Sequence, residues 1–404
     1  MGVEVEFAQT ERLSVKERDR RWDAVRQLMD SHQLEAIVAP HSTSPAGLNQ
    51  LDSCYLTGCG TVTQPVACFF PRRGDPIAFV KDVDRCASAK AWTPIARDVV
   101  KGLPQGIVEA HRDAGLTRGR VGLSGLTGVP NATEGVASYG LVRILREQLP
   151  DIDWVDVTHQ LRAIRMVKST EETALLTRAA RLVDRSLERA STAAQPGSTD
   201  LEVWSAAIAE LCVQGSQPPL RSRWGSGLRP TMVDRPMHGE LQRGSIVVAE
   251  IDAERWGYRT YGIQPIAVAG CDAILRDLYA VEGEFWDACF ELLKPGLTFR
   301  QLLDETEAVV TQFRTRPGRY EKLQGTLAID GCGLGLDAPT LDGRLRDESM
   351  ERETLRAGSV VVLRPLVSID IGFRVLSATW ADTVVIEEHG ARRLGERSVG
   401  LLTV

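Results

Sequence analysis

Two charged residues stand at matching points in the second half of the sequence. Glu250 ends the apolar run Gly244–Glu250 (GSIVVAE), and Arg364 ends the similar run Gly358–Arg364 (GSVVVLR). A carboxylate can act as a general base, and a guanidinium binds a substrate carboxylate through two parallel hydrogen bonds. Two interpretations of the pair stay open: a base beside a substrate anchor, or a buried salt bridge.

Three polar residues after Glu250 are candidates for substrate binding. Asp252 lies two positions further on and therefore on the same face of the expected strand, although a solvent-facing or turn role fits it equally well. Tyr258 and Tyr261 follow, and each hydroxyl can donate a hydrogen bond to a polar substrate or an oxyanion. A half-buried packing role is the more common one for tyrosines at such positions.

A cysteine and a polar loop add candidates for nucleophilic and acid–base chemistry. Cys332 lies between two glycines and would need Arg364 to stabilise its thiolate, whereas a buried cysteine is usually an inert, space-filling residue. Asp234 and His238 belong to the loop TMVDRPMHGE. His238 is a candidate general acid or base, and an exposed loop histidine is the commoner alternative.

The elements that must position these residues fall into two predicted domains, residues 1–160 and 161–404. The first domain alternates helical and strand-like runs, which indicates an α/β fold. Ser169 is a good N-cap for a long amphipathic helix that opens the second domain. The predicted elements of the first domain are helices at Val15–Gln33 and Tyr139–Leu149 and strands at Leu34–Ala39, Val66–Phe70 and Pro76–Val80.

The second domain contains an internal repeat. Pro196–Glu202 (PGSTDLE) and Pro295–Gln301 (PGLTFRQ) each begin a helix with a capping box. The two strand-like runs with Glu250 and Arg364 follow them in turn. A repeat of this length predicts two pseudo-symmetric halves packed together, with Glu250 and Arg364 approaching each other near the pseudo-twofold axis.

Composition excludes several classes of protein. Lys and Arg total 48 against 54 Asp and Glu, a net charge of −6 without like-charge runs, so neither a nucleic-acid nor an anionic-membrane partner is expected. No apolar stretch approaches the ~20 residues of a spanning helix. The eight cysteines form no CxxC pair, which indicates reduced thiols and a cytoplasmic location.

Taken in order, these segments resemble the creatinase/aminopeptidase P/prolidase family, which has the pita-bread fold. The resemblance covers nearly the whole chain. It is carried by the junction LRAIRMVKSTEE at Leu161–Glu172, the two PG-x-T helices, the GY turn at Gly257–Tyr258, the segment Gly331–Leu336 (GCGLGL) and the closing DTVVIEEHGARRL at Asp382–Leu394. It implies an α/β (α+β) protein with a creatinase-type N-terminal domain and a C-terminal pita-bread domain.

Most members of that family hold two metal ions with two Asp, one His and two Glu. The resemblance maps these ligands onto Glu250, Tyr261, Cys332, Arg364 and Ala381. A guanidinium opposes a cation at such a position. We therefore predict no metal and no cofactor.

Creatinase is the family's metal-free enzyme, but this chain also departs from its pattern. The resemblance places the catalytic histidine near Val233–Asp234, and His238 would serve only if the loop were shortened. Ile263 stands where creatinase has an acidic residue. Creatine is therefore not the predicted substrate.

The leading hypothesis is a metal-independent, creatinase-like hydrolase, or alternatively a lyase, that cleaves a C–N or related bond in a small, polar, carboxylate-bearing metabolite. Arg364 would bind the carboxylate, and Glu250 or the loop with Asp234 and His238 would move the proton. The alternatives are a non-catalytic binding protein and, third, a peptidase with one metal on Glu250, Asp252 and Cys332. The resemblance also implies a homodimer in which Tyr55–Val62 (YLTGCGTV) closes the neighbour's pocket, with Tyr55 as a substrate contact.

Overall fold

The computed structural model describes residues 13–41, 51–59, 66–80, 92, 95–98, 102–128, 135–316, 319–343 and 352–404. The chain forms two compact units, Met1–Arg165 and Met166–Val404. The division lies five residues after the predicted one, because helix α6 (Thr158–Met166) belongs almost wholly to the first unit.

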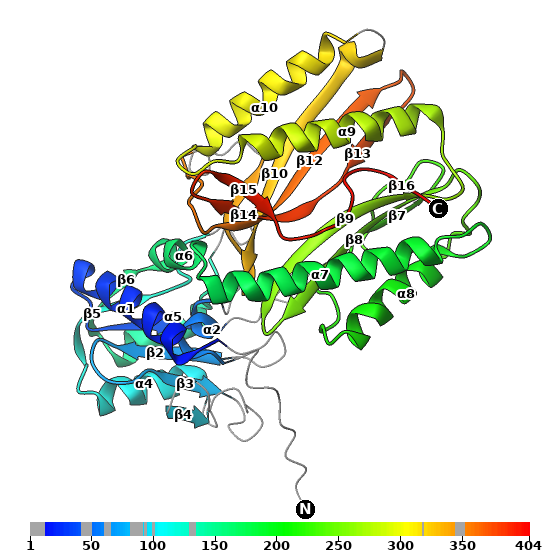
Figure 1. Cartoon of the computed structure of the whole chain (residues 1–404). Coiled ribbons are helices and arrows are strands. Elements are labelled where there is room, and N and C mark those ends of the chain that lie inside the picture. The colour runs from blue at the N-terminus through cyan, green and yellow to red at the C-terminus, as the bar shows by residue number, and fades with distance from the viewer. Residues whose placement is uncertain are drawn as a thin grey trace, which may run out of the picture. The chain divides into compact units, whose positions relative to one another are not determined.

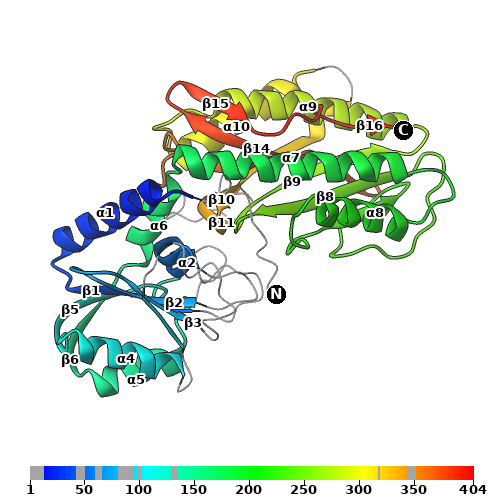
Figure 2. The same cartoon turned by 60° about the horizontal axis from the view of Figure 1, so that its bottom comes forward.

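The first unit is built on a six-stranded sheet in the order β4-β3-β2-β1-β5-β6. Neighbouring residues of β2 face opposite sides of it: the ring of Phe69 lies 4.6 Å from that of His111, and that of Phe70 lies 6.0 Å from that of Trp22. Helices α4 and α5 cover one face and α1 and α2 the other (Figure 2). The strands are β1 (Ala36–Ala39), β2 (Val66–Pro71), β3 (Ile77–Val80), β4 (Ile95–Asp98), β5 (Arg118–Leu123) and β6 (Asp151–Asp156), and the helices are α1 (Val15–His32), α2 (Leu51–Thr57), α4 (Leu103–Asp113) and α5 (Tyr139–Gln148).

The second unit contains a ten-stranded sheet whose main path is β15-β14-β12-β10-β9-β8-β7. Helices α7 and α8 pack along the β7–β9 half, and α9 and α10 along the other half (Figure 1). The helices are α7 (Thr170–Ala193), α8 (Asp200–Val213), α9 (Ala273–Leu292), α10 (Phe299–Arg314) and the short 3₁₀ helix η2 (Arg319–Lys322). The strands are β7 (Trp224–Gly227), β8 (Ile246–Arg255), β9 (Tyr258–Ala267), β10 (Leu323–Gly333), β11 (Gly335–Asp342), β12 (Val360–Asp370), β13 (Val375–Thr379), β14 (Asp382–Glu387), β15 (Gly390–Arg393) and β16 (Leu402–Thr403).

The predicted repeat is present in the second unit. Thr199 with Glu202 and Thr298 with Gln301 form complete capping boxes at the starts of α8 and α10. Each of these helices is followed by a strand that is buried along most of its length, β8 in the first half and β12 in the second. The predicted fold class is thus confirmed, and Glu250 and Arg364 lie on equivalent strands.

The two halves of the sheet are joined at few points. Among the described residues, strand β9 pairs with β10 only at Arg259 and Gly333. A second link joins Ile263 to Ala381, whose backbones exchange hydrogen bonds of 3.1 and 3.3 Å. We call this junction, formed by Arg259 with Gly333 and Ile263 with Ala381, the seam. Side chains from both halves of the sheet lie close together there. No helix among the described residues is long and apolar enough to cross a membrane.

Candidate functional site

The positions mapped onto metal ligands from the sequence come together at the seam of the second unit. Nε of Arg364 on β12 donates to the hydroxyl of Tyr261 on β9 at 3.2 Å. The thiol of Cys332 on β10 lies 3.3 Å from the hydroxyl of Thr260, the neighbour of Tyr261. Ala381 is bridged to Ile263, which lies opposite Glu250 in the β8–β9 ladder. The mapped positions are therefore near one another in the folded chain.

The expected direct pair of Glu250 and Arg364 is not formed, since no hydrogen bond or ion pair joins them in the described part of the chain. Strands β9 and β10 lie between their strands in the sheet. Each charge has another partner: Nε of Arg221 lies 2.5 Å from Oε1 of Glu250, and Nη2 of Arg364 lies 3.5 Å from Oδ2 of Asp330. Two ion pairs therefore replace the single one that the repeat suggested.

Arg221 connects the two ion pairs. Its Nη1 lies 3.7 Å from Oδ2 of Asp330, and its guanidinium carbon lies 4.6 Å from the centroid of the Tyr261 ring. The hydroxyl of Tyr261 donates a short hydrogen bond to the same Asp330 oxygen. We call these residues the arginine–carboxylate cluster: Arg221, Glu250, Tyr261, Asp330 and Arg364.

The cluster is charge-balanced, with two guanidinium groups facing two carboxylates. Burial lowers the pKa of Arg221 and of Arg364, but Tyr261 and the two carboxylates outweigh this effect, and both pKa values lie above the usual value for arginine. Burial, reinforced by Asp330, raises the pKa of Tyr261 well above its ordinary value. At neutral pH the arginines are therefore charged and the tyrosine is neutral.

Asp252, predicted to bind substrate, instead supports Arg221. Its Oδ1 accepts the backbone N–H of Arg221 at 2.9 Å, and its Oδ2 pairs with the guanidinium of Arg259. Burial raises the pKa of Asp252, and Arg259 opposes that rise. The carboxylate holds the loop that delivers Arg221 to the cluster.

The residues of this site do not suit a pair of metal ions. Divalent ions of this kind need carboxylates or imidazoles with free lone pairs. Here the mapped positions supply two neutral side chains, an alanine, a guanidinium and one carboxylate already bound by Arg221. The alternative single-metal set is divided as well: Glu250 binds Arg221, Asp252 binds Arg259 and Cys332 contacts Thr260. The described residues contain no group of three or more His, Cys, Asp or Glu that could hold a metal ion.

Cys332 fits the space-filling interpretation better than the nucleophilic one. Its side chain is buried, and burial raises the pKa of its thiol to about 12. Its contacts are with Thr260 and the backbone of Asp330, and no contact joins it to Arg364 among the described residues. A thiol that stays protonated at neutral pH is a poor nucleophile.

Two predicted substrate-binding tyrosines are buried within their own units. The hydroxyl of Tyr258 donates to Glu172 at 2.8 Å, which ties β9 to the first turn of α7. Tyr55 lies under the guanidinium of Arg21, and its hydroxyl accepts a hydrogen bond from Arg20 at 3.3 Å. Part of the segment 55–62 lies outside the described residues, so its role toward a neighbouring subunit stays a prediction.

The loop with Asp234 and His238 lies at the surface. Both side chains are exposed, and no contact links either of them to the cluster in the described part of the chain. The backbone N–H groups of Met237 and Gly239 bind the carboxylate of Asp200, which holds the loop and leaves His238 in a left-handed conformation. Nothing in this arrangement assigns His238 a proton-transfer role.

Sequence reasoning missed Arg221 and Asp330. Asp330 had a signal, because it lies two residues before Cys332 and therefore on the same face of β10. Arg221 had none, since it lies in the irregular segment before β7. Only the folding of that segment against β8 brings its guanidinium to Glu250.

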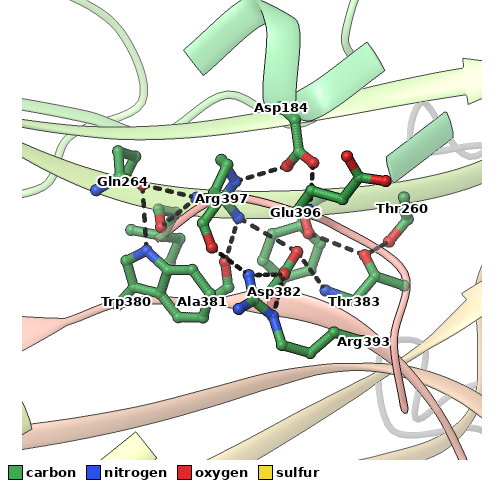
Figure 3. A network of polar contacts seen from close by, with 12 residues as sticks. Asp184, Thr260, Gln264, Trp380, Ala381, Asp382, Thr383, Arg393, Glu396 and Arg397 are labelled. Carbon is green, nitrogen blue, oxygen red and sulfur yellow. Dashed lines mark hydrogen bonds and ion pairs between the residues drawn. The ribbon is translucent and has the colours of Figure 1, made fainter. Parts of the chain in front are cut away.

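A second polar network surrounds Arg397, next to the backbone link between Ile263 and Ala381 (Figure 3). The guanidinium of Arg397 binds Asp184 of α7 at 2.8 Å, the carbonyl oxygen of Ile263 at 3.1 Å and that of Ala381 at 2.8 Å. Asp382 also binds it, at 3.3 Å. Arg397 therefore connects the Ile263–Ala381 link between the two halves of the sheet to helix α7, a contact that we call the clamp.

Curated relatives cover most of this chain. It is 24% identical over 277 residues to the Xaa-Pro dipeptidase of Pyrococcus furiosus, a match that covers 67% of this chain and 74% of the relative. It is 28% identical over 307 residues to the probable dipeptidase PepE of Mycobacterium tuberculosis, covering 70% of this chain and 75% of that protein.

Solved structures share the fold. The prolidase from Pyrococcus horikoshii superposes with a TM-score of 0.72 at 18% identity, over 94% of this chain and 99% of that one. The Xaa-Pro dipeptidase from Bacillus anthracis superposes with a TM-score of 0.74 at 18% identity, over 96% and 100%. The model of the creatinase/prolidase N-terminal domain matches residues 21–167, and that of metallopeptidase family M24 matches residues 174–388. The chain therefore belongs to metallopeptidase family M24.

Proposed function

We propose that this chain is a metal-independent hydrolase that cleaves a C–N bond in a small, polar, carboxylate-bearing substrate. The observation that carries the proposal is the pair of guanidinium groups at the place where the family's metal ligands were mapped. Arginine stays charged when partly buried, and its planar N–H groups match a carboxylate. Two groups that can bind a substrate carboxylate thus lie close to the positions to which the family's metal ligands map.

The two guanidinium groups retain capacity for a ligand. Within the described residues, Nη1 of Arg364 and both Nη atoms of Arg221 donate no hydrogen bond. The side chains are 22% exposed for Arg221 and 13% for Arg364, so an anion from solution can reach them. Bidentate binding of a carboxylate would orient the neighbouring bond of the substrate over the cluster.

The comparisons support hydrolysis as the class of reaction. The relatives include proteins named Xaa-Pro dipeptidase and dipeptidase, and a dipeptide carries both a C–N bond and a free carboxylate. Dipeptides, Xaa-Pro dipeptides among them, are therefore the first substrates to test. N-acetyl amino acids are the next, since they keep the amide bond and the carboxylate.

The second candidate is a non-catalytic protein that binds the same class of ligand. It is favoured by one observation: both carboxylates of the cluster contact a guanidinium, at 2.5 Å for Glu250 and at 3.5 Å for Asp330. Both carboxylates are thus already engaged in ion pairs within the chain. This candidate predicts saturable binding without product.

The deciding experiment combines metal analysis with turnover. Protein purified without chelator is assayed for Mn, Fe, Co and Zn per subunit, and hydrolysis is followed with and without EDTA. The proposal expects less than about a tenth of an equivalent of metal, because a tight site keeps its ion through purification. It also expects turnover that EDTA leaves unchanged and that Arg364→Ala abolishes.

Other outcomes identify the alternatives. One or two equivalents of bound metal with EDTA-sensitive turnover would support a metallopeptidase and refute the proposal. Binding of dipeptides or N-acetyl amino acids without any product would support the non-catalytic protein. Turnover at the wild-type level in both Glu250→Gln and Arg364→Ala would show that the cluster is not the active site.

A further inference from the structure

The arginines of the cluster hold Asp330 less closely than they hold Glu250. Its Oδ2 receives the Tyr261 hydroxyl and faces Nη2 of Arg364 at 3.5 Å and Nη1 of Arg221 at 3.7 Å. These guanidinium distances exceed the 2.7–2.9 Å or so of a direct charge-assisted hydrogen bond. Its other oxygen, Oδ1, accepts no hydrogen bond from any residue that the structure describes.

Glu250 behaves differently, although it faces the same arginine. It is 1% exposed and receives Nε of Arg221 at 2.5 Å. The side chain of Asp330 is 13% exposed, equal to that of Arg364. Glu250 is therefore the permanent partner of Arg221, and Asp330 is the partner that a ligand can replace.

A ligand carboxylate competes directly with Asp330. It can take the free N–H groups of both arginines with good geometry, whereas Asp330 reaches each of them at long range. Once the ligand takes those N–H groups, Asp330 loses its two long guanidinium contacts and keeps the hydrogen bond from the Tyr261 hydroxyl on Oδ2. Oδ1 of Asp330, which accepts no hydrogen bond from a described residue, is then the oxygen that can accept one from a water molecule.

We propose that Asp330 is a further catalytic residue, one that neutralises Arg221 and Arg364 in the free chain and is released by the substrate carboxylate to accept a proton. This inference rests on the proposed hydrolase function. The oxygen of a water molecule forms a bond to the amide carbon, and its proton goes to Oδ1 of Asp330. The C–N bond then breaks, and the same proton passes to the leaving nitrogen. The products are one carboxylic acid and one amine, without any co-reactant.

Binding is the first test, and it does not depend on turnover. N-acetylglycine is titrated by calorimetry into wild-type protein and the Asp330→Asn variant, with N-acetylglycine amide as the ligand that lacks a carboxylate. Removal of the internal competitor should tighten N-acetylglycine binding at least fivefold and leave the amide unbound by both proteins. Unchanged or weaker binding of N-acetylglycine would overturn the proposal, since Asp330 would then not compete with the ligand.

Turnover is the second test, measured on the best substrate of the dipeptide and N-acetyl amino acid screen. Asp330→Asn should lower kcat at least 100-fold while KM falls, a split that a merely structural role does not produce. A kcat within about threefold of wild type, together with tighter binding, would overturn the catalytic part. If the wild-type protein binds N-acetylglycine but hydrolyses none of the screened compounds, the proposed function fails while the competition result still stands.

Two further variants guard against misfolding and simple charge effects. Asp330→Ser removes the carboxylate with a smaller side chain and should tighten binding in the same direction. Asp304→Asn on α10 removes one negative charge from an exposed position away from the cluster, and should change neither affinity nor kcat. Tighter binding in Asp304→Asn equal to that in Asp330→Asn would show a general charge effect and overturn the proposal.

Discussion

The guanidinium of Arg221 meets the carboxylate of Glu250 at 2.5 Å although the two residues are 29 positions apart, and Glu250 is almost fully buried. A buried carboxylate without a partner is strongly unfavourable. The pair therefore matters for folding as well as for the site.

Loss of Arg221 should destabilise the protein. Arg221→Met leaves Glu250 buried without its partner, which costs about 3 kcal/mol in the free energy of unfolding. Urea denaturation followed by circular dichroism measures the change. The control is Arg392→Met, whose pair with Glu387 is half exposed, so that less than about 1 kcal/mol is expected. Equal losses in the two variants would contradict the importance of the Arg221–Glu250 pair.

Glu282 should make the protein less stable as the pH rises. It is fully buried on α9, and burial raises its pKa from 4.5 to about 8, although the backbone N–H of Trp380, which it accepts, lowers it. The folded state thus favours the protonated form. The stabilisation is complete below pH 4.5, decreases up to about pH 8 and is absent above it.

The replacement Glu282→Gln removes this titration. The variant should lose less stability than the wild type between pH 5 and pH 9, with a difference on the order of 4 kcal/mol. Thermal unfolding across that range measures it. Glu284→Gln is the matched control, because Glu284 lies on the same helix with a half-exposed side chain. A wild-type pH profile in Glu282→Gln would refute the prediction.

Cys332 should resist alkylation in the folded protein. Its thiol is buried, with a pKa of about 12, whereas Cys212 is exposed. Iodoacetamide at neutral pH, followed by peptide mass spectrometry, should label Cys212 within minutes and Cys332 only after denaturation. Rapid labelling of native Cys332 would revive the nucleophile hypothesis. Cys332→Ser should retain ligand binding.

Arg397 should not tolerate replacement by lysine. Its planar group binds acceptors on α7, β9 and the start of β14 at once, and a single ammonium cannot reach all of them. Arg397→Lys should lower the free energy of unfolding by about 2 kcal/mol or more. Arg181→Lys is the control, because the pair of Arg181 with Glu396 is exposed. A loss in Arg397→Lys no larger than in the control would show that the clamp is dispensable.

Much of the architecture was predictable from the sequence. Helix α7 begins at the predicted cap Ser169, and the predicted boxes at Thr199 and Thr298 begin α8 and α10. Caps, apolar runs and repeats are local signals, and they depend on residues close together in the chain. The same signals placed Glu250 and Arg364 on equivalent strands. The positions assigned to metal ligands came from the family resemblance instead.

The partners within the site were decided by the tertiary structure alone. Arg221 comes from an irregular segment before β7, and Asp330 comes from β10 in the other half of the sheet. Whether a buried carboxylate contacts an arginine depends on the order of the strands in the sheet and on the path of a loop. Neither can be predicted from the spacing of residues along the sequence. The sequence therefore identified Glu250 and Arg364, and the fold added Arg221 and Asp330 and determined which charges pair, because pairing requires contact between residues that are distant in the chain.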